Sequence, residues 1–325
     1  MAVTKQFTGI DYLKFVAALM VVAIHSGTPY YLEVVFRVAV PFFFISSSFL
    51  FWYKKKDLLG FVKRMALLYL AWFIIEVPFV YQKFSDSSIW EFLKGLLFSN
   101  TFFASWYIIA SIEGMALLVL LSKWLNNTQL LLLGCAFYCF AISGGGYYGL
   151  LPAGIRDFVD CVDGVIPLTN SFITAFIFCV LGKLFADGFN HPVSQGKRSF
   201  MLVLTIASIA LLFSEMFLMR SHKRFTDAFF ALPMLAWLLL FCATKAPFWE
   251  RFSVRIGTEL RKASTLIYFV HFIILSAIEP FIGLIHGGPL SVLVVKFFIT
   301  ASISVVLAFA IIHLSKKIRL LKLLY

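Results

Sequence analysis

Apolar stretches of membrane-spanning length recur along almost the whole chain. Stretches of about 17–25 apolar residues can cross the hydrocarbon core of a bilayer as α-helices, and clusters of charged and turn-forming residues separate them here. The sequence predicts ten spans, at residues 8–26, 34–53, 64–82, 105–123, 129–143, 170–186, 199–218, 227–244, 264–283 and 289–314. We therefore expect an all-α fold over residues 1–325, a single membrane domain of about ten transmembrane helices.

The basic residues are distributed unevenly between the segments that connect these spans. With the N-terminus placed in the cytoplasm, cytoplasmic segments hold 19 of the 28 lysines and arginines, and the opposite segments hold seven. The remaining two, Lys14 and Lys296, fall within spans. Because basic residues accumulate on the cytoplasmic side of membrane proteins, we expect both termini in the cytoplasm.

The overall composition excludes a soluble protein. Of 325 residues, 61% are hydrophobic and 14% charged, whereas soluble domains have about 45–50% apolar and about 25% charged residues. The net charge of +12 lies mostly in short loops between apolar spans, which is typical of membrane orientation rather than of a nucleic-acid groove. The expected partner is therefore membrane lipid and not nucleic acid, and the number of subunits stays open.

Cysteine usage gives no sign of a metal site or a disulfide framework. The five cysteines are odd in number, and no Cys-x-x-Cys motif occurs. All except Cys161 lie in apolar stretches, so we interpret them as small buried hydrophobic residues. They are Cys135, Cys139, Cys161, Cys179 and Cys242. No metal is expected.

The first span contains both a cation and a titratable ring. Lys14 and His25 are eleven residues apart, which is three helical turns plus about 20°, so they share one face about 16 Å apart along the axis. A charged group that faced lipid would cost several kcal/mol, so this face should line protein or a water-filled cavity. A long ligand with an anionic end and a reactive end, such as acyl-coenzyme A, would fit. Alternatively, Lys14 extends to the interface and His25 only ends the helix.

Other polar residues in or beside spans are candidates with competing interpretations. Glu33 and Arg37 are spaced for an i,i+4 ion pair, but Glu33 could instead orient His25 as an acid beside a catalytic base. Glu113 is an intramembrane carboxylate, which is a functional candidate or a group paired with another buried polar side chain. His271 follows Tyr268 by three residues and so shares its helix face.

Five segments in order along the chain resemble membrane-bound acyltransferase family 3. "GIDYLKFVAALMVVAIHS" is similar to the family's first helix, with a basic residue, ten residues, and then a histidine, here Lys14 and His25. The other segments are "FRVAVPFFFISSSFL", "FVKRMALLY", "SWYIIAS" and "LIYFVHFIIL". The chain departs from the family pattern where glycine, histidine and arginine are usual, at Ser48, Ala104–Ser105 and Thr169. It is most similar to the membrane domain that is fused to racemases in some bacterial serine and alanine racemases.

The resemblance implies transfer of an acyl group, usually acetyl, from cytoplasmic acyl-CoA to an acceptor across the membrane. For this chain it implies a bacterial cytoplasmic-membrane O-acetyltransferase whose acceptor is an envelope polysaccharide or a lipid-linked sugar. Lys14, Lys63 and Arg64 would contact the CoA phosphates, although the last two also fit plain positive-inside charge. The implied catalytic residues are His25, Glu33 and Glu113.

His25 would act as a general base or carry the acyl group as a short-lived intermediate. The implied substrate-binding residues are Arg37, Trp106, Tyr107, Asn170, Tyr268 and His271. Two other functions remain open, a small-molecule transporter such as an amino-acid permease, and an assembly or sensor subunit with a degenerate site.

The charge distribution generates a prediction about topology. Reporter fusions at Tyr325 and at Asp160 should report opposite sides of the membrane, with Tyr325 in the cytoplasm. A periplasmic signal from the Tyr325 fusion would contradict the ten-span arrangement.

Overall fold

The chain folds as a helical bundle. The computed structural model describes residues 6–85, 88–98, 105–190, 195–282 and 290–325, and within these ranges the regular secondary structure is helical, with no strand. The α-helices are α1 (Thr8–His25), α2 (Tyr30–Phe36), α3 (Ala39–Tyr53), α4 (Leu58–Ser85), α5 (Ile89–Phe98), α6 (Trp106–Leu121), α7 (Asn127–Gly144), α8 (Ala153–Asp163), α9 (Phe172–Asp187), α10 (Gln195–Leu218), α11 (Ala231–Lys245), α12 (Val254–Ile282) and α13 (Leu290–Leu314). The expected all-α fold is confirmed.

Seven segments in the described part are long and apolar enough to cross a membrane. They are Thr8–His25, Tyr30–Tyr53, Leu58–Phe79, Asn127–Gly144, Ser199–Leu218, Val254–Pro280 and Val292–Leu314. Two shorter apolar helices are Trp106–Leu121 and Ala231–Lys245. The chain therefore has the helices of a multi-pass membrane protein.

Seven of the ten predicted spans coincide with these long segments, whereas the spans predicted at 105–123, 170–186 and 227–244 fall on the shorter helices α6, α9 and α11, of 16, 16 and 15 residues. The other differences are mainly at helix ends. The span predicted at 34–53 consists of two helices, α2 and α3, and Arg37 is the C-cap residue of α2. Helices α4 and α12 begin six and ten residues before the predicted apolar spans, at Leu58 and Val254. Hydropathy marks the apolar part of a helix, whereas backbone hydrogen bonding can continue into its charged ends.

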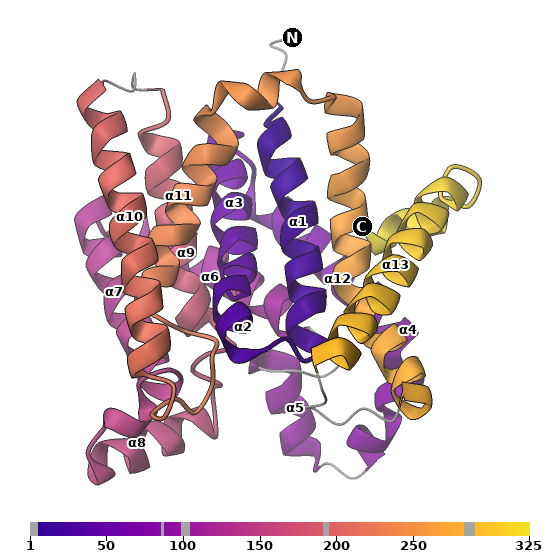
Figure 1. Ribbon diagram of the computed structural model, residues 1–325, viewed down its shortest axis with the longest axis horizontal. Coiled ribbons are helices and arrows are strands. Elements are labelled where there is room, and N and C mark those ends of the chain that lie inside the picture. The colour runs from indigo at the N-terminus through magenta and orange to yellow at the C-terminus, as the bar shows by residue number, and fades with distance from the viewer. Residues whose placement is uncertain (1–5, 86–87, 99–104, 191–194, 283–289) are drawn as a thin grey trace.

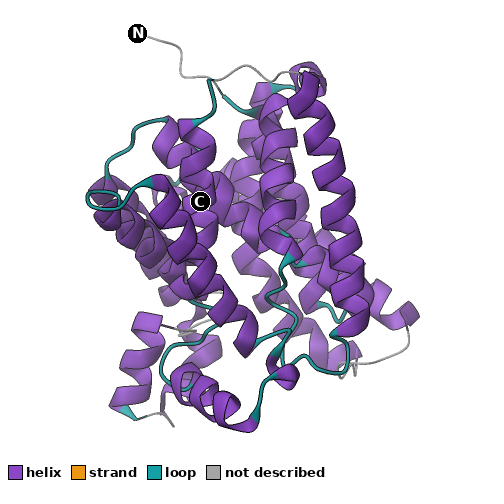
Figure 2. Ribbon diagram, turned by 90° about the vertical axis from the view of Figure 1, so that its left-hand side faces the viewer, coloured by secondary structure: helices purple, strands orange, loops and turns teal. Residues whose placement is uncertain are grey.

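Two helix pairs form the centre of the bundle. α1 packs along α12, and α3 packs along α9, and α1 and α3 lie in the middle of Figure 1. α4, α10 and α13 lie at the outside and expose large apolar side chains, including Leu70, Phe217 and Phe298. Figure 2 shows the same bundle from the side, with loops gathered at its two ends. The exposed apolar side chains are suited to contact lipid.

The cysteines correct one expectation drawn from sequence. Only Cys179 is buried, whereas Cys135, Cys139 and Cys242 lie exposed at the bundle surface. An apolar stretch in a membrane bundle need not be buried in protein, because apolar side chains also face the lipid. The interpretation of these three cysteines as buried hydrophobic residues was wrong.

A left-handed glycine lies two residues after His25, the last residue of α1. Gly27 has φ +88°, a conformation that residues with a Cβ rarely adopt. The hydroxyl of Ser26 donates to the Val22 carbonyl at 2.8 Å, and that of Thr28 donates to the Ala23 carbonyl. These contacts fix the place where the chain leaves the helix, and thereby hold His25 at the end of α1.

The α3–α9 contact depends on a small residue. A Cβ on Gly182 of α9 would lie 2.5 Å from the Ile45 carbonyl oxygen and 2.7 Å from Cβ of Ser48. The Ser48 hydroxyl donates to the Cys179 carbonyl at 2.6 Å. Ser48, where the resembled family usually has glycine, therefore contacts α9.

Gly182→Ala should destabilise the protein. The neighbouring atoms include backbone of α3, which cannot rotate away, so we expect a loss of about 1–3 kcal/mol and a lower melting temperature in detergent. Gly154→Ala in α8 is the matched control, because a Cβ at Gly154 meets nothing within 4 Å. Equal melting temperatures for the two variants would contradict the proposed tight contact.

Candidate functional site

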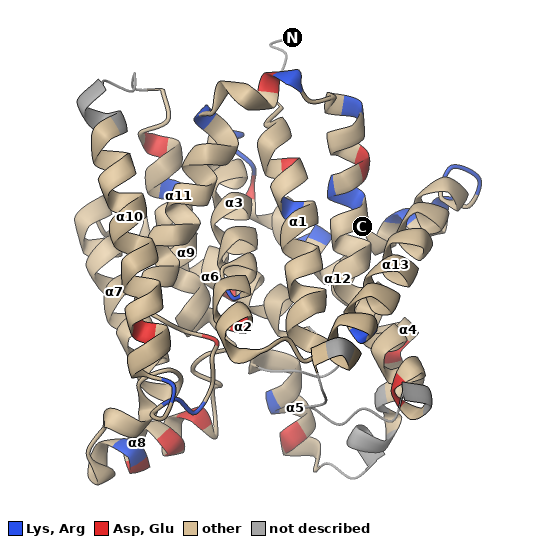
Figure 3. Cartoon of the chain, viewed as in Figure 1, with Lys and Arg blue, Asp and Glu red and all other residues tan. Residues whose placement is uncertain are grey.

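A large cavity lined by cations opens at one end of the bundle. This basic cavity has a volume of about 600 Å³ and is bordered by α1, α3, α4, α6 and α12. Six cationic side chains line it, namely Lys14, Lys54, Lys55, Lys56, Arg64 and Arg261. Figure 3 shows basic residues near the start of α1 and of α12, at the same end of the molecule as the N-terminus. A cavity with this lining attracts a polyanion.

Few negative charges oppose these cations. Asp57 is the single carboxylate among the lining residues described, and its Oδ1 accepts a hydrogen bond from the Gly60 amide at 2.6 Å. Partial burial, followed by repulsion from Arg64, Lys54 and Arg261, lowers the pKa of Lys56. A bound anion would relieve this repulsion, so the electrostatics of the cavity favour anion binding.

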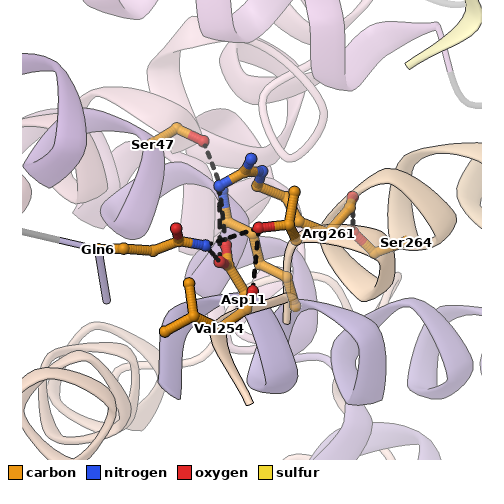
Figure 4. Close-up of polar contacts among 8 residues, drawn as sticks. Gln6, Asp11, Ser47, Val254, Arg261 and Ser264 are labelled. Carbon is orange, nitrogen blue, oxygen red and sulfur yellow. Dashed lines mark hydrogen bonds and ion pairs between the residues drawn. The ribbon is translucent and has the colours of Figure 1, made fainter. Parts of the chain in front are cut away.

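Two of the cations are held by polar neighbours. Arg261 of α12 lies 3.4 Å from the buried carboxylate of Asp11 in α1, which also accepts a hydrogen bond from the Gln6 side chain at 3.0 Å. Figure 4 shows Gln6 and Arg261 converging on Asp11, with Ser47 nearby. Lys14 donates to the Ser47 hydroxyl at 3.4 Å. These contacts join α1, α3 and α12 around the cavity.

A second cavity contains the predicted histidine. This histidine cavity has a volume of about 240 Å³. Its polar and aromatic lining includes His25, Arg37, Trp106, Thr169, Asn170, Asp227 and Tyr268. Four predicted substrate-binding residues, Arg37, Trp106, Asn170 and Tyr268, are thus brought together with His25. Tyr268 lines the basic cavity as well, so its ring is a wall common to both.

His25 sits in an aromatic environment beside a second histidine. Its ring centroid is 4.4 Å from that of Phe272 and 5.4 Å from that of His271. His271 is fully buried, and its Nδ1 lies 3.1 Å from the Ile267 carbonyl oxygen. Donation from Nδ1 to that carbonyl leaves Nε2 as an acceptor, and no partner of Nε2 is found among the described residues. His271 therefore contacts the His25 ring but does not itself line the histidine cavity.

Glu33 and Arg37 belong to a charged network on the other side of His25. Arg37 pairs with Glu33 at 2.7 Å and also with Asp227, and the Thr226 hydroxyl donates to Glu33 at 2.5 Å. The i,i+4 ion pair expected as one of two alternatives is present, but the two residues do not pair only with each other. Glu33, Arg37 and His25 also line a third cavity of about 530 Å³, here termed the side cavity. Glu33 and His25 therefore line one cavity, but the contacts of the Glu33 carboxylate described here are with Arg37 and Thr226.

Two predicted site residues lie apart from these cavities. Lys63 is exposed and lines none of the three, although its neighbour Arg64 lines the basic cavity. Glu113 is half-buried and lines none of them either. Tyr107 and Ser111 line the basic cavity from α6. Glu113 follows Ser111 by two positions, which is a rotation of about 200° around the helix, so it points away from this cavity.

Sequence reasoning missed Arg261 and Asp227 as site residues. Arg261, Ser264 and Tyr268 recur at i, i+3 and i+7 in α12 and all line the basic cavity, so their shared helix face was a signal available in the sequence. Asp227 precedes α11 in an irregular segment, where no periodicity indicates which way a side chain points. Its place beside Arg37 depends on tertiary packing.

Comparisons with known proteins identify the family to which the chain belongs. A family model described as an acyltransferase domain matches residues 7–313. An amino-acid racemase of Enterococcus faecalis is 30% identical over 225 residues, covering 63% of this chain and 31% of the relative. A second amino-acid racemase of that organism is 25% identical over 355 aligned residues, covering 97% of this chain and 47% of the relative.

A serine/alanine racemase of Enterococcus gallinarum is 26% identical, covering 53% of this chain and 28% of the relative. The chain spans less than half the length of these curated relatives. No solved structure matches. Because the family model covers nearly the whole bundle and both main cavities, the chain belongs to acyltransferase family 3.

Proposed function

We propose that this protein transfers an acyl group, most often acetyl, from cytoplasmic acyl-CoA to a hydroxyl of an envelope glycan or a lipid-linked sugar. It would do so in the bacterial cytoplasmic membrane, as a ten-span protein with both termini in the cytoplasm. In this orientation the basic cavity opens to the cytoplasm, where acyl-CoA is found. Membership of an acyltransferase family and the multi-pass helical bundle support the proposal.

One observation carries the proposal. A single face of α1 presents Lys14 to the basic cavity and Val21, Ile24 and His25 to the histidine cavity, and the two cavities share Tyr268. The cationic end suits the phosphates of a CoA thioester. The thioester would then lie toward His25, about 16 Å further along the helix.

The chemistry requires one proton acceptor and one leaving group. The acceptor hydroxyl attacks the thioester carbonyl carbon, a C–O bond forms and the C–S bond breaks. His25 takes the hydroxyl proton as a general base and returns it to the departing CoA thiolate. In the alternative route, His25 is acylated first, releasing the thiol, and the acceptor hydroxyl then displaces imidazole from the acyl carbonyl.

The histidine cavity is suited to a polyhydroxylated acceptor. Trp106 offers a ring face, while Asn170 and Asp227 offer hydrogen-bonding groups beside His25. Stacking on an aromatic ring together with side-chain hydrogen bonds provides both the apolar surface and the fixed polar groups of a small-molecule site. The side cavity, which shares His25 and Arg37 with the histidine cavity, provides a second approach to the reacting atoms.

Lys14 should contribute to donor binding rather than to chemistry. Lys14→Ala should raise KM for acetyl-CoA more than it lowers kcat, because contacts with the phosphates are the same in the ground and transition states. Lys14→Arg keeps the charge and should retain much of the activity. Lys123→Ala, which removes an exposed lysine outside the cavities, is the control. An unchanged KM with a collapsed kcat would assign Lys14 another role.

His25 should be required for transfer. Because a general base contributes about 10²–10⁴-fold, His25→Ala should reduce acceptor-dependent thiol release from acetyl-CoA at least a hundredfold, and His25→Gln should fail equally. The assay uses purified protein with an envelope-glycan extract, and detergent melting should be almost unchanged. Retained activity in His25→Gln would reduce His25 to a structural residue.

The same assay separates transfer from transport. A transporter would take up substrate in liposomes that contain no acyl-CoA and would release no thiol. If folded wild-type protein gives both results, the proposed acyltransferase function is wrong and the protein is a transporter.

A further inference from the structure

Three aromatic residues that line the basic cavity lie in mutual contact. They are contributed by three different helices, Phe43 by α3, Tyr107 by α6 and Tyr268 by α12. Their centroids form a triangle with sides of 5.5 Å between the two tyrosines, 5.9 Å between Phe43 and Tyr107, and 6.0 Å between Phe43 and Tyr268. All three rings line the basic cavity, and we term them the ring triangle.

The ring triangle is held in place by the core of the bundle. Phe43 and Tyr268 are 7% and 5% exposed. Phe44, which lines the histidine cavity, packs on Tyr107 at a centroid distance of 4.8 Å, and Phe269, which lines the basic cavity, packs on Tyr268 at 5.1 Å. Close-packed interiors yield little to added volume, so the triangle sets a stiff limit on what can lie beside it.

The triangle contains the residue that the linings of the basic and histidine cavities share, Tyr268. Tyr268 lines both the basic and the histidine cavity, whereas Phe43 and Tyr107 line only the basic one. In the proposed binding mode, with the CoA phosphates on Lys14 and Arg261, the acyl group would lie beside Tyr268 on its way to His25. All six cations of the basic cavity lie outside the lining of the histidine cavity, where Arg37 is paired with Glu33 and Asp227.

We propose that the ring triangle selects the acyl group by its length, admitting acetyl to His25 and hindering longer chains. This inference rests on the proposed acyltransferase function and adds the structural element that chooses the donor. One methylene in a hydrophobic pocket changes specificity by about 10–200-fold, so a stiff ring wall is sufficient to separate acetyl from butyryl. The volume of the rings, and not the tyrosine hydroxyl, performs the selection.

The experiment compares acetyl-CoA, propionyl-CoA and butyryl-CoA with one acceptor extract. The quantity measured is the ratio of kcat/KM for butyryl-CoA to kcat/KM for acetyl-CoA, which is below one in the wild type. Phe43→Leu and Tyr268→Leu should each raise this ratio at least about tenfold. Tyr268→Phe keeps the ring and should leave the ratio unchanged, whatever its effect on rate.

A control separates selection from general loosening of the core. Phe49 lies on the same helix as Phe43 and is fully buried, but it lines none of the three cavities. Phe49→Leu should lower stability to a similar degree without changing the ratio. Tyr268→Trp, which adds volume, should lower the propionyl-to-acetyl ratio and provides a test that does not depend on truncation.

The outcomes distinguish this inference from the function on which it rests. Suppose that the wild type transfers acetyl and that the folded leucine and tryptophan variants have the same kcat/KM ratios between donors as the wild type. This result would overturn selection by the ring triangle and leave the proposed acyltransferase function intact. Equal kcat/KM values of the wild type for all three donors would likewise overturn the selection and leave the acyltransferase function intact. Absence of transfer from every donor would overturn the acyltransferase itself, and the inference with it.

Discussion

The structure depends on the cost of placing charged and polar side chains within an apolar bundle. A charge exposed to hydrocarbon is destabilising by several kcal/mol, so ionisable groups on neighbouring helices must face each other or a shared water-filled space. α1, α3 and α12 satisfy this requirement together. Lys14, Ser47 and Arg261 surround one cavity, and the polar face of α1 continues to His25 in the next. The cavities form because these polar side chains would be destabilised if they faced the lipid.

The same constraint gives the two cavities different chemistry. In the basic cavity six cations meet a single lining carboxylate among the described residues, and a positive excess remains for a ligand. Near His25, the one Arg37 guanidinium faces the two carboxylates of Glu33 and Asp227, so no positive excess remains there for an anion. The first cavity is thus suited to a polyanion and the second to a neutral, hydroxyl-bearing molecule, with Tyr268 between them.

Much of the fold could be predicted because lipid imposes a simple rule on sequence. Each predicted span falls on one or two helices of the structure, since a bilayer requires about 20 apolar residues and internally satisfied backbone groups. The break between α2 and α3 was missed, because Tyr30–Tyr53 as a whole is apolar enough to read as one span. Burial of individual residues such as Cys135 and Cys242 could not be predicted either, since lipid and protein interior select the same side chains.

For the site, the sequence determined whatever one helix fixes by itself. The eleven-residue spacing places Lys14 and His25 on one face, and the four-residue spacing pairs Glu33 with Arg37, because helix geometry is local. Only the tertiary structure decided which residues of other helices lie beside these four residues in the cavities. Arg261 reaches the basic cavity, Asp227 reaches Arg37, and Glu113 and Lys63 lie apart, because these relations depend on how separate helices are rotated and packed. The ring triangle is of this second kind, since its three rings come from three helices that meet only in the folded bundle.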